Sequence, residues 1–117
     1  MLPTIDAVEA LPGPYEILEM RDGEQLQICP QSWEFGKMEI HPRDGRPGKE
    51  ILVIRLHVSK AAKPTVPQYW DVTSQHLAAA LLGYLEHAGS TFPTFTITKH
   101  GGGPRGRHTL EAVPAAP

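Results

Sequence analysis

The alternation of apolar and polar residues predicts a chain built mainly from strands. The clearest strand covers residues 51–60, and one of its faces is continuously apolar. That face consists of Leu52, Ile54, Leu56 and Val58. On the opposite face, apolar residues give way to Arg55 and His57. We therefore expect one face of this strand in the core and one that becomes basic towards its end.

Residues 33–41 also alternate, and their apolar face switches in the middle. Trp33, Phe35 and Lys37 share one face, whereas Met38 and Ile40 share the other. The switch occurs at Gly36, and a glycine inside a strand is typical of a bulge or of a bend at a barrel corner.

The remaining strands are predicted from shorter runs. Residues 15–20 and 24–29 flank an Asp-Gly pair, which predicts either a hairpin or one long strand bent at a bulge at Gly23. Residues 69–72 are compatible with a further short strand, and residues 94–100 and 107–113 alternate near the end of the chain.

One helix is expected, within residues 71–89. Apolar residues recur there at helical spacing, and the shared face consists of Leu77, Leu81, Tyr84, Leu85 and Ala88. Asp71 or Thr73 is suited to cap the amino terminus, and Gly89 is suited to follow the carboxyl terminus.

This order of elements, β-β-β-α-β-β, predicts a mainly β protein with one helix, in the α+β class. Over residues 15–113 it resembles the OB-fold, a five-stranded barrel with a helix between the third and fourth strands. The basic third strand, the YWD segment and the leucine-rich helix resemble the middle of phage and plasmid-type single-stranded-DNA-binding domains. The alternative is an open antiparallel sheet with one packed helix. Residues 1–14 are expected to form a loose arm and residues 114–117 a tail.

Length and composition indicate a single small domain. The chain has 117 residues, with 11 glycines and 12 prolines, which favours many turns and short elements. No apolar run approaches the roughly 18–20 residues needed to cross a bilayer, and the first residues do not resemble a signal peptide. The single cysteine, Cys29, cannot form an internal disulfide, so we expect a cytoplasmic protein with no membrane association.

Charge is unevenly distributed along the chain. Residues 1–36 hold seven acidic residues and one basic residue, whereas residues 37–110 hold five acidic and ten basic residues. This asymmetry indicates either an anionic partner on one side of the molecule or an ordinary solvated surface.

The stretch KHGGGPRGRH at residues 99–108 matches a dinucleotide fingerprint by its letters. That fingerprint requires a following helix, but only eleven residues remain after Gly106, and they alternate like a strand. We interpret the stretch as a glycine-rich turn between the last two strands. Its basic side chains, Lys99, Arg105 and Arg107, are expected either to contact phosphates or to face water.

Two aromatic residues suggest how bases would be bound. Trp33 and Phe35 share a face with Lys37, and single strands are bound by stacking bases on aromatic side chains beside a basic groove. With Arg55 in the same groove they would form such a platform. The alternative is that both aromatic side chains belong to the core.

Metal binding and catalysis have little support in the sequence. The six histidines do not form an H-x-x-x-H pair, and there is no second cysteine. No serine lies in a G-x-S-x-G setting, and the carboxylates show no paired spacing. We therefore expect neither an enzyme nor a cofactor.

The sequence thus predicts non-sequence-specific binding of single-stranded nucleic acid, in the replication or repair of a phage or mobile element. Lys37, Arg55, Lys99, Arg105 and Arg107 would contact the backbone, and Trp33 and Phe35 would stack with bases. The alternative is a protein-interaction module that binds a partner or a second copy through an exposed strand edge.

Overall fold

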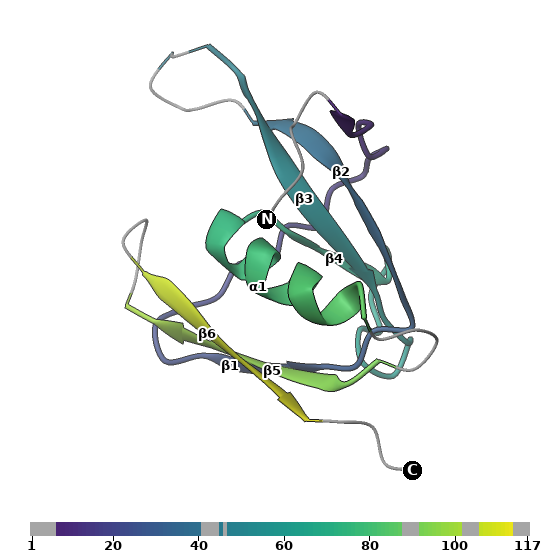
Figure 1. Cartoon of the computed structure of the whole chain (residues 1–117), viewed down its shortest axis with the longest axis vertical. Helices are drawn as coiled ribbons and strands as arrows, with labels where there is room; N and C mark the ends of the chain where they lie inside the picture. Colours follow the sequence, from purple (N-terminus) through teal and green to yellow (C-terminus); the bar gives the residue numbers. More distant parts are fainter. Residues whose placement is uncertain (1–6, 41–44, 46, 88–91, 102–105, 114–117) are drawn as a thin grey trace.

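The computed structural model describes residues 7–40, 45, 47–87, 92–101 and 106–113. These residues form the strands β1 (Gln25–Ile28), β2 (Ser32–Ile40), β3 (Lys49–His57), β4 (Tyr69–Val72), β5 (Thr94–His100) and β6 (Arg107–Val113), and the helix α1 (Gln75–Leu85). The strands form two three-stranded antiparallel sheets, in the orders β1-β5-β6 and β2-β3-β4. The helix lies between the two sheets (Figure 1). The mainly β, α+β architecture predicted from the sequence is therefore confirmed.

The core fills the space between the sheets and α1. Alternation puts the apolar face of β3 inside, as predicted, and Phe95 and Ile97 of β5 face it from the other sheet. The buried residues of this core are Ile28, Ile54, Leu56, Val58, Val72, Leu77, Ala78, Leu81, Leu82, Leu85, Phe95 and Ile97. Their burial supplies the hydrophobic stabilisation that holds the two sheets together.

The helix is shorter than predicted and begins at a different cap. Ser74 is the N-cap, and its hydroxyl accepts a hydrogen bond from the backbone N–H of Leu77. Neither of the predicted N-caps, Asp71 and Thr73, caps the helix. Asp71 still belongs to β4, and Thr73 precedes the Ser74 cap. Gly89 lies outside the described residues.

The two sheets do not close into a five-stranded barrel, so the barrel expected from the element order is not supported. The predicted hairpin of residues 15–20 with residues 24–29 is also wrong, because the two runs bond to different strands. Leu18 N–H donates to the carbonyl of Asp71 in β4, whereas residues 25–28 pair with β5. The Asp-Gly turn does form, with Gly23 at a φ of 82°, but the Gly23 N–H donates to Lys99 of β5.

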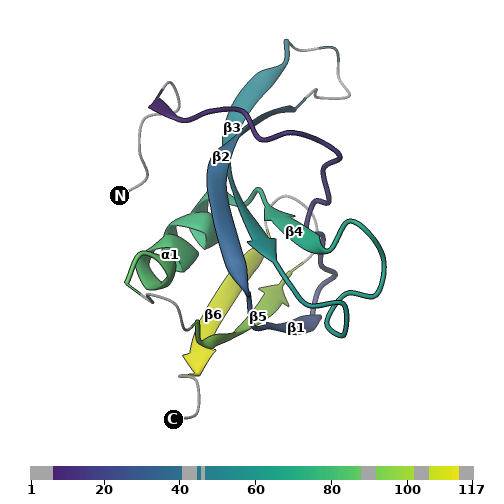
Figure 2. The same ribbon diagram turned by 90° about the vertical axis from the view of Figure 1, so that its right-hand side faces the viewer.

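Residues 9–18 form what we call the N-terminal strap. It pairs with one edge of the β2-β3-β4 sheet at Lys37 and with the other edge at Asp71. Between these two points it crosses the face of the sheet opposite α1 (Figure 2). Residues 9–14, expected to belong to a loose arm, are therefore packed against the sheet, and Leu11 is buried. Residues 1–6 and 114–117 lie outside the described residues.

The strap explains why the apolar face of β2 switches at Gly36. The pairing of β2 with β3 runs on through Gly36 and Val53, so there is no bulge at this glycine. Instead, Met38 and Val53 form a second small core with Leu11 on the strap side of the sheet. One face of the β2-β3 pair is buried in the main core and the other face, further along the strands, is buried under the strap. The switch of the apolar face at Gly36 reflects this change.

None of the helical structure in the described residues is long and apolar enough to span a membrane.

Candidate functional site

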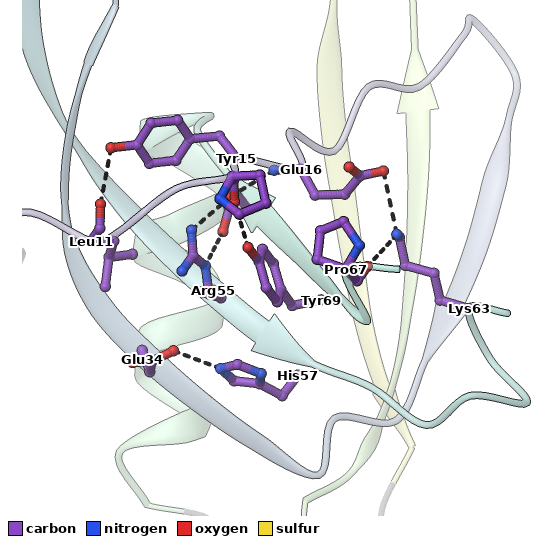
Figure 3. A network of polar contacts seen from close by, with 11 residues as sticks. Leu11, Tyr15, Glu16, Glu34, Arg55, His57, Lys63, Pro67 and Tyr69 are labelled. Carbon is purple, nitrogen blue, oxygen red and sulfur yellow. Dashed lines mark hydrogen bonds and ion pairs between the residues drawn. The ribbon is translucent and has the colours of Figure 1, made fainter. Parts of the chain in front are cut away.

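The sequence predicts Arg55 in an open groove, but in the structure Arg55 is buried. Its side chain is 4% exposed, and its Nε and Nη2 lie 2.7 and 3.2 Å from the two carboxylate oxygens of Asp71. The Tyr69 ring stacks under the guanidinium, with 4.1 Å from Cζ to the ring centroid, and the carboxylate also accepts the Glu16 N–H of the strap (Figure 3). Arg55 can be buried because the register of β3 with β4 places the carboxylate of Asp71 directly opposite it.

The charge of Arg55 is well compensated. Burial alone would lower its pKa, but the hydrogen bond and charge of Asp71 outweigh that effect, with smaller contributions from Tyr69 and Glu34, so the pKa of Arg55 is raised. The ion pair anchors the strap rather than offering a cation to a ligand.

The predicted stacking platform is not assembled in the structure. Trp33 and Phe35 lie on the face of β2 that looks towards α1, opposite the face that carries Arg55, and both are partly buried against the core. Lys37 follows them on the same face and forms an ion pair with Glu50 at 3.1 Å. The aromatic residues thus contribute mainly to packing, which was the alternative interpretation of the sequence.

Lys99 and Arg107 line different parts of an open depression beside the amino terminus of α1, and the register of β5 with β6 places them on opposite faces of that sheet. We call this depression the α1 cleft. It consists of two adjoining hollows of about 580 and about 380 Å³, which share Ser74 and His108. The first hollow is lined by Ile17, Leu18, Glu19, Met20, Thr73, Ser74, Lys99 and His108, and the second by Ser74, His76, Gly106, Arg107 and His108. These volumes are in the range of small-ligand sites.

The alternation of β5 and β6 places two basic residues in this cleft. Phe95 and Ile97 of β5 point into the core, so Lys99, two residues further on, lies on the same face. Lys99 pairs in register with His108 of β6. The inner face of the sheet therefore changes from apolar to basic where it passes the amino terminus of α1.

The electrostatic character of the cleft favours an anion. Neither Lys99 nor Arg107 forms an ion pair with another described residue, and Glu19 is the one carboxylate among the described residues that line the two hollows. The amino end of α1 adds the partial positive charge of a helix terminus. Arg105 lies outside the described residues.

The pKa of His108 is affected by this positive charge. Burial lowers the pKa of His108 below its ordinary value of 6.5, and the charge of Lys99 lowers it further. The unfolded chain therefore binds this proton more readily than the folded protein. The resulting contribution to stability is complete above about pH 6.5 and is lost as the pH falls through the lowered pKa.

We therefore expect His108→Gln to reduce the loss of stability on acidification. The measurement is urea unfolding of both proteins at about pH 7.5 and about pH 5.5, either side of the ordinary histidine pKa. The difference in unfolding free energy between the two pH values should be smaller in the variant. An equal difference in both proteins would show that His108 does not titrate abnormally.

Several residues of the cleft are absent from the sequence prediction. His108 is detectable in principle, since it continues the alternation of Leu110 and Ala112 on β6. Ser74 and Ile17 are not, because they reach the cleft only through the packing of α1 and of the strap against the second sheet. No group of three or more His, Cys, Asp or Glu in the described part of the chain is arranged to hold a metal ion.

Comparison with known proteins gives no significant match to this chain, whether with protein families, curated proteins or solved structures. Its function is therefore inferred from the α1 cleft and the sequence.

Proposed function

We propose that the chain binds single-stranded nucleic acid without strong sequence preference, and that the α1 cleft holds backbone phosphates. The supporting observation is that Lys99 and Arg107 line two adjoining hollows that share His108, and that neither Lys99 nor Arg107 is neutralised by a described carboxylate. Arg105, which lies outside the described residues, is proposed from the sequence to contribute a further phosphate contact. A role in replication or repair of a phage or mobile element accords with the resemblance of the middle of the chain to phage and plasmid-type single-stranded-DNA-binding domains.

The walls of the cleft suit a single strand better than a duplex. Ile17, Leu18 and Met20 provide apolar surface in the same hollow that Lys99 and His108 line. A single strand exposes the faces of its bases and its phosphates at the same time, so it can contact both kinds of surface. Contacts to phosphates and apolar contacts to base faces do not distinguish one base from another, which accounts for the proposed lack of sequence preference.

The low net charge sets the conditions in which binding is measurable. The formal net charge is −2, so affinity depends on the local field of the cleft rather than on the whole molecule. We therefore expect binding that weakens steeply with salt.

Neutralising the two cleft cations is expected to weaken binding about tenfold, which corresponds to about 1.4 kcal/mol. The double variant Lys99→Gln, Arg107→Gln removes the charges while keeping most of the side-chain bulk. Titration of a fluorescently labelled oligo-dT by anisotropy at several salt concentrations measures the effect. If both residues contact phosphates, the slope of log affinity against log salt should become shallower by about 1.4, at about 0.7 per phosphate of a single strand.

A charge-matched control separates local contacts from net charge. Lys49 and Lys60 are exposed and do not line the cleft, so Lys49→Gln, Lys60→Gln changes the net charge equally. This control should bind nearly as tightly as the wild-type protein. Equal weakening in both double variants would refute the cleft as the binding site, and no wild-type binding at low salt would refute the proposed function.

A further inference from the structure

The positive charge of the α1 cleft is concentrated where its two hollows meet. Ser74 and His108 line both hollows. Lys99 reaches the same place, because its Nζ lies only 2.8 Å from the position that a β-carbon on Gly106 would take, and Gly106 lines the second hollow. Lys99, His108 and Ser74 thus lie around the junction of the two hollows.

The first hollow is open to solvent and has an apolar floor. Leu18 and Met20, which form part of its wall, also pack against the main hydrophobic core. A hollow of about 580 Å³ with an apolar floor has room for one nucleoside, and Lys99 and His108 line the same hollow and can meet the phosphate attached to it.

We propose that Lys99 and His108 form a subsite for one terminal phosphate, and that the hollow lined by Ile17 and Met20 holds the nucleoside attached to it. This inference rests on the proposed function, since it identifies which part of a nucleic acid strand the cleft prefers. A terminal phosphate carries about 1.5 to 2 negative charges near pH 7, and an internal phosphodiester carries one. The terminal group therefore gains more from the ammonium of Lys99.

The charged groups around the subsite come from three parts of the fold. Lys99, Arg107 and His108 belong to the β5-β6 hairpin, and His76 belongs to the first turn of α1. Glu19, in the segment that follows the strap, is the one carboxylate among the lining residues that the structure describes. A bound phosphate also offsets the repulsion between Lys99 and a protonated His108, which would let His108 take up a proton at higher pH than in the free protein.

The test compares three oligo-dT strands of equal length with the full-length protein. One carries a 5′-phosphate, one a 3′-phosphate, and one has hydroxyl groups at both ends. We expect at least one phosphorylated strand to bind about tenfold more tightly than the unmodified strand, as a charge-assisted contact allows. Lys99→Gln should reduce this advantage to less than about twofold, whereas Lys99→Arg and the control Lys60→Gln should retain it.

The outcomes separate this inference from the proposed function. If all three strands bind with equal affinity, the terminal-phosphate subsite is refuted and the proposed function stands. If none of the strands binds at low salt, both fail. The proposed nucleoside site is tested by displacing the phosphorylated strand with thymidine monophosphate and with inorganic phosphate. If the two compounds displace it equally well, the nucleoside site is refuted.

Discussion

Replacing Asp71 with alanine is expected to lower the free energy of unfolding by about 3–5 kcal/mol, the cost of removing one partner from a buried ion pair. The Asp71 carboxylate is fully buried, accepts two hydrogen bonds from Arg55 and one from the Glu16 N–H, and lies where the strap meets β4. Without it, the guanidinium of Arg55 remains buried with no counter-charge. The variant should therefore lose both the ion pair and the attachment of the strap.

Urea unfolding followed by circular dichroism measures this loss. The matched control is Glu50→Ala, which breaks the ion pair with Lys37, in which the Glu50 side chain is 49% exposed. An exposed pair of this kind contributes less than about 1 kcal/mol. The double variant Arg55→Met, Asp71→Leu should be more stable than Asp71→Ala, because it leaves no unpaired charge in the core. Equal stability of Asp71→Ala and Glu50→Ala would contradict the structure.

The ion pair also shows what the sequence can and cannot predict about the fold. Arg55 and Asp71 are 16 residues apart, and each alone has the pattern of a solvent-facing charge in or near a strand. Only the register of β3 with β4, together with the strap that covers them, places the two side chains in contact and out of water. Local alternation predicts β3 and its inner face correctly, because that face depends on the neighbouring residues alone.

The strap is the clearest case of structure that local patterns do not reveal. Residues 9–14 contain two prolines and show no clear period, so they do not predict a strand. Their order comes from single contacts with distant residues, such as Leu11 with Gly36 and the Tyr69 hydroxyl donating to the Pro14 carbonyl. Without knowledge of the partner surface, the same composition predicts a loose arm.

The candidate site was predictable in part. Basic residues in a glycine-rich connection point to Lys99 and Arg107, and the structure brings both to the α1 cleft. The other predicted contacts do not join them, because Arg55 is neutralised by Asp71 and Trp33 faces the core from the other sheet. A surface formed by two sheets and a helix depends on tertiary packing. The alternation of residues within one strand does not predict that packing.

Substituting Gly36 with alanine is expected to destabilise the protein by about 1–3 kcal/mol, the usual cost of overpacking a core. A β-carbon at this position would lie 2.6 Å from Leu11 Cγ and 2.7 Å from the Glu9 carbonyl oxygen. The strap would have to move away from β2, which breaks the two hydrogen bonds that join it to Lys37. Urea unfolding measures the loss of stability, and hydrogen exchange at the Leu11 amide measures release of the strap.

The matched control is Gly83→Ala, which is expected to stabilise the protein. A β-carbon there would have no neighbour within 4 Å, and Gly83 lies inside α1. Gly83→Ala should therefore raise stability by about 0.5–1 kcal/mol, because alanine favours the helix more than glycine does. The double variant Gly36→Ala, Leu11→Ala removes the clash with the Leu11 side chain but keeps the clash with the Glu9 carbonyl oxygen. Its loss of stability should therefore be smaller than the sum of the losses of the two single variants. A Gly36→Ala protein that is as stable as the wild type and has a protected Leu11 amide would show that the strap does not pack on Gly36.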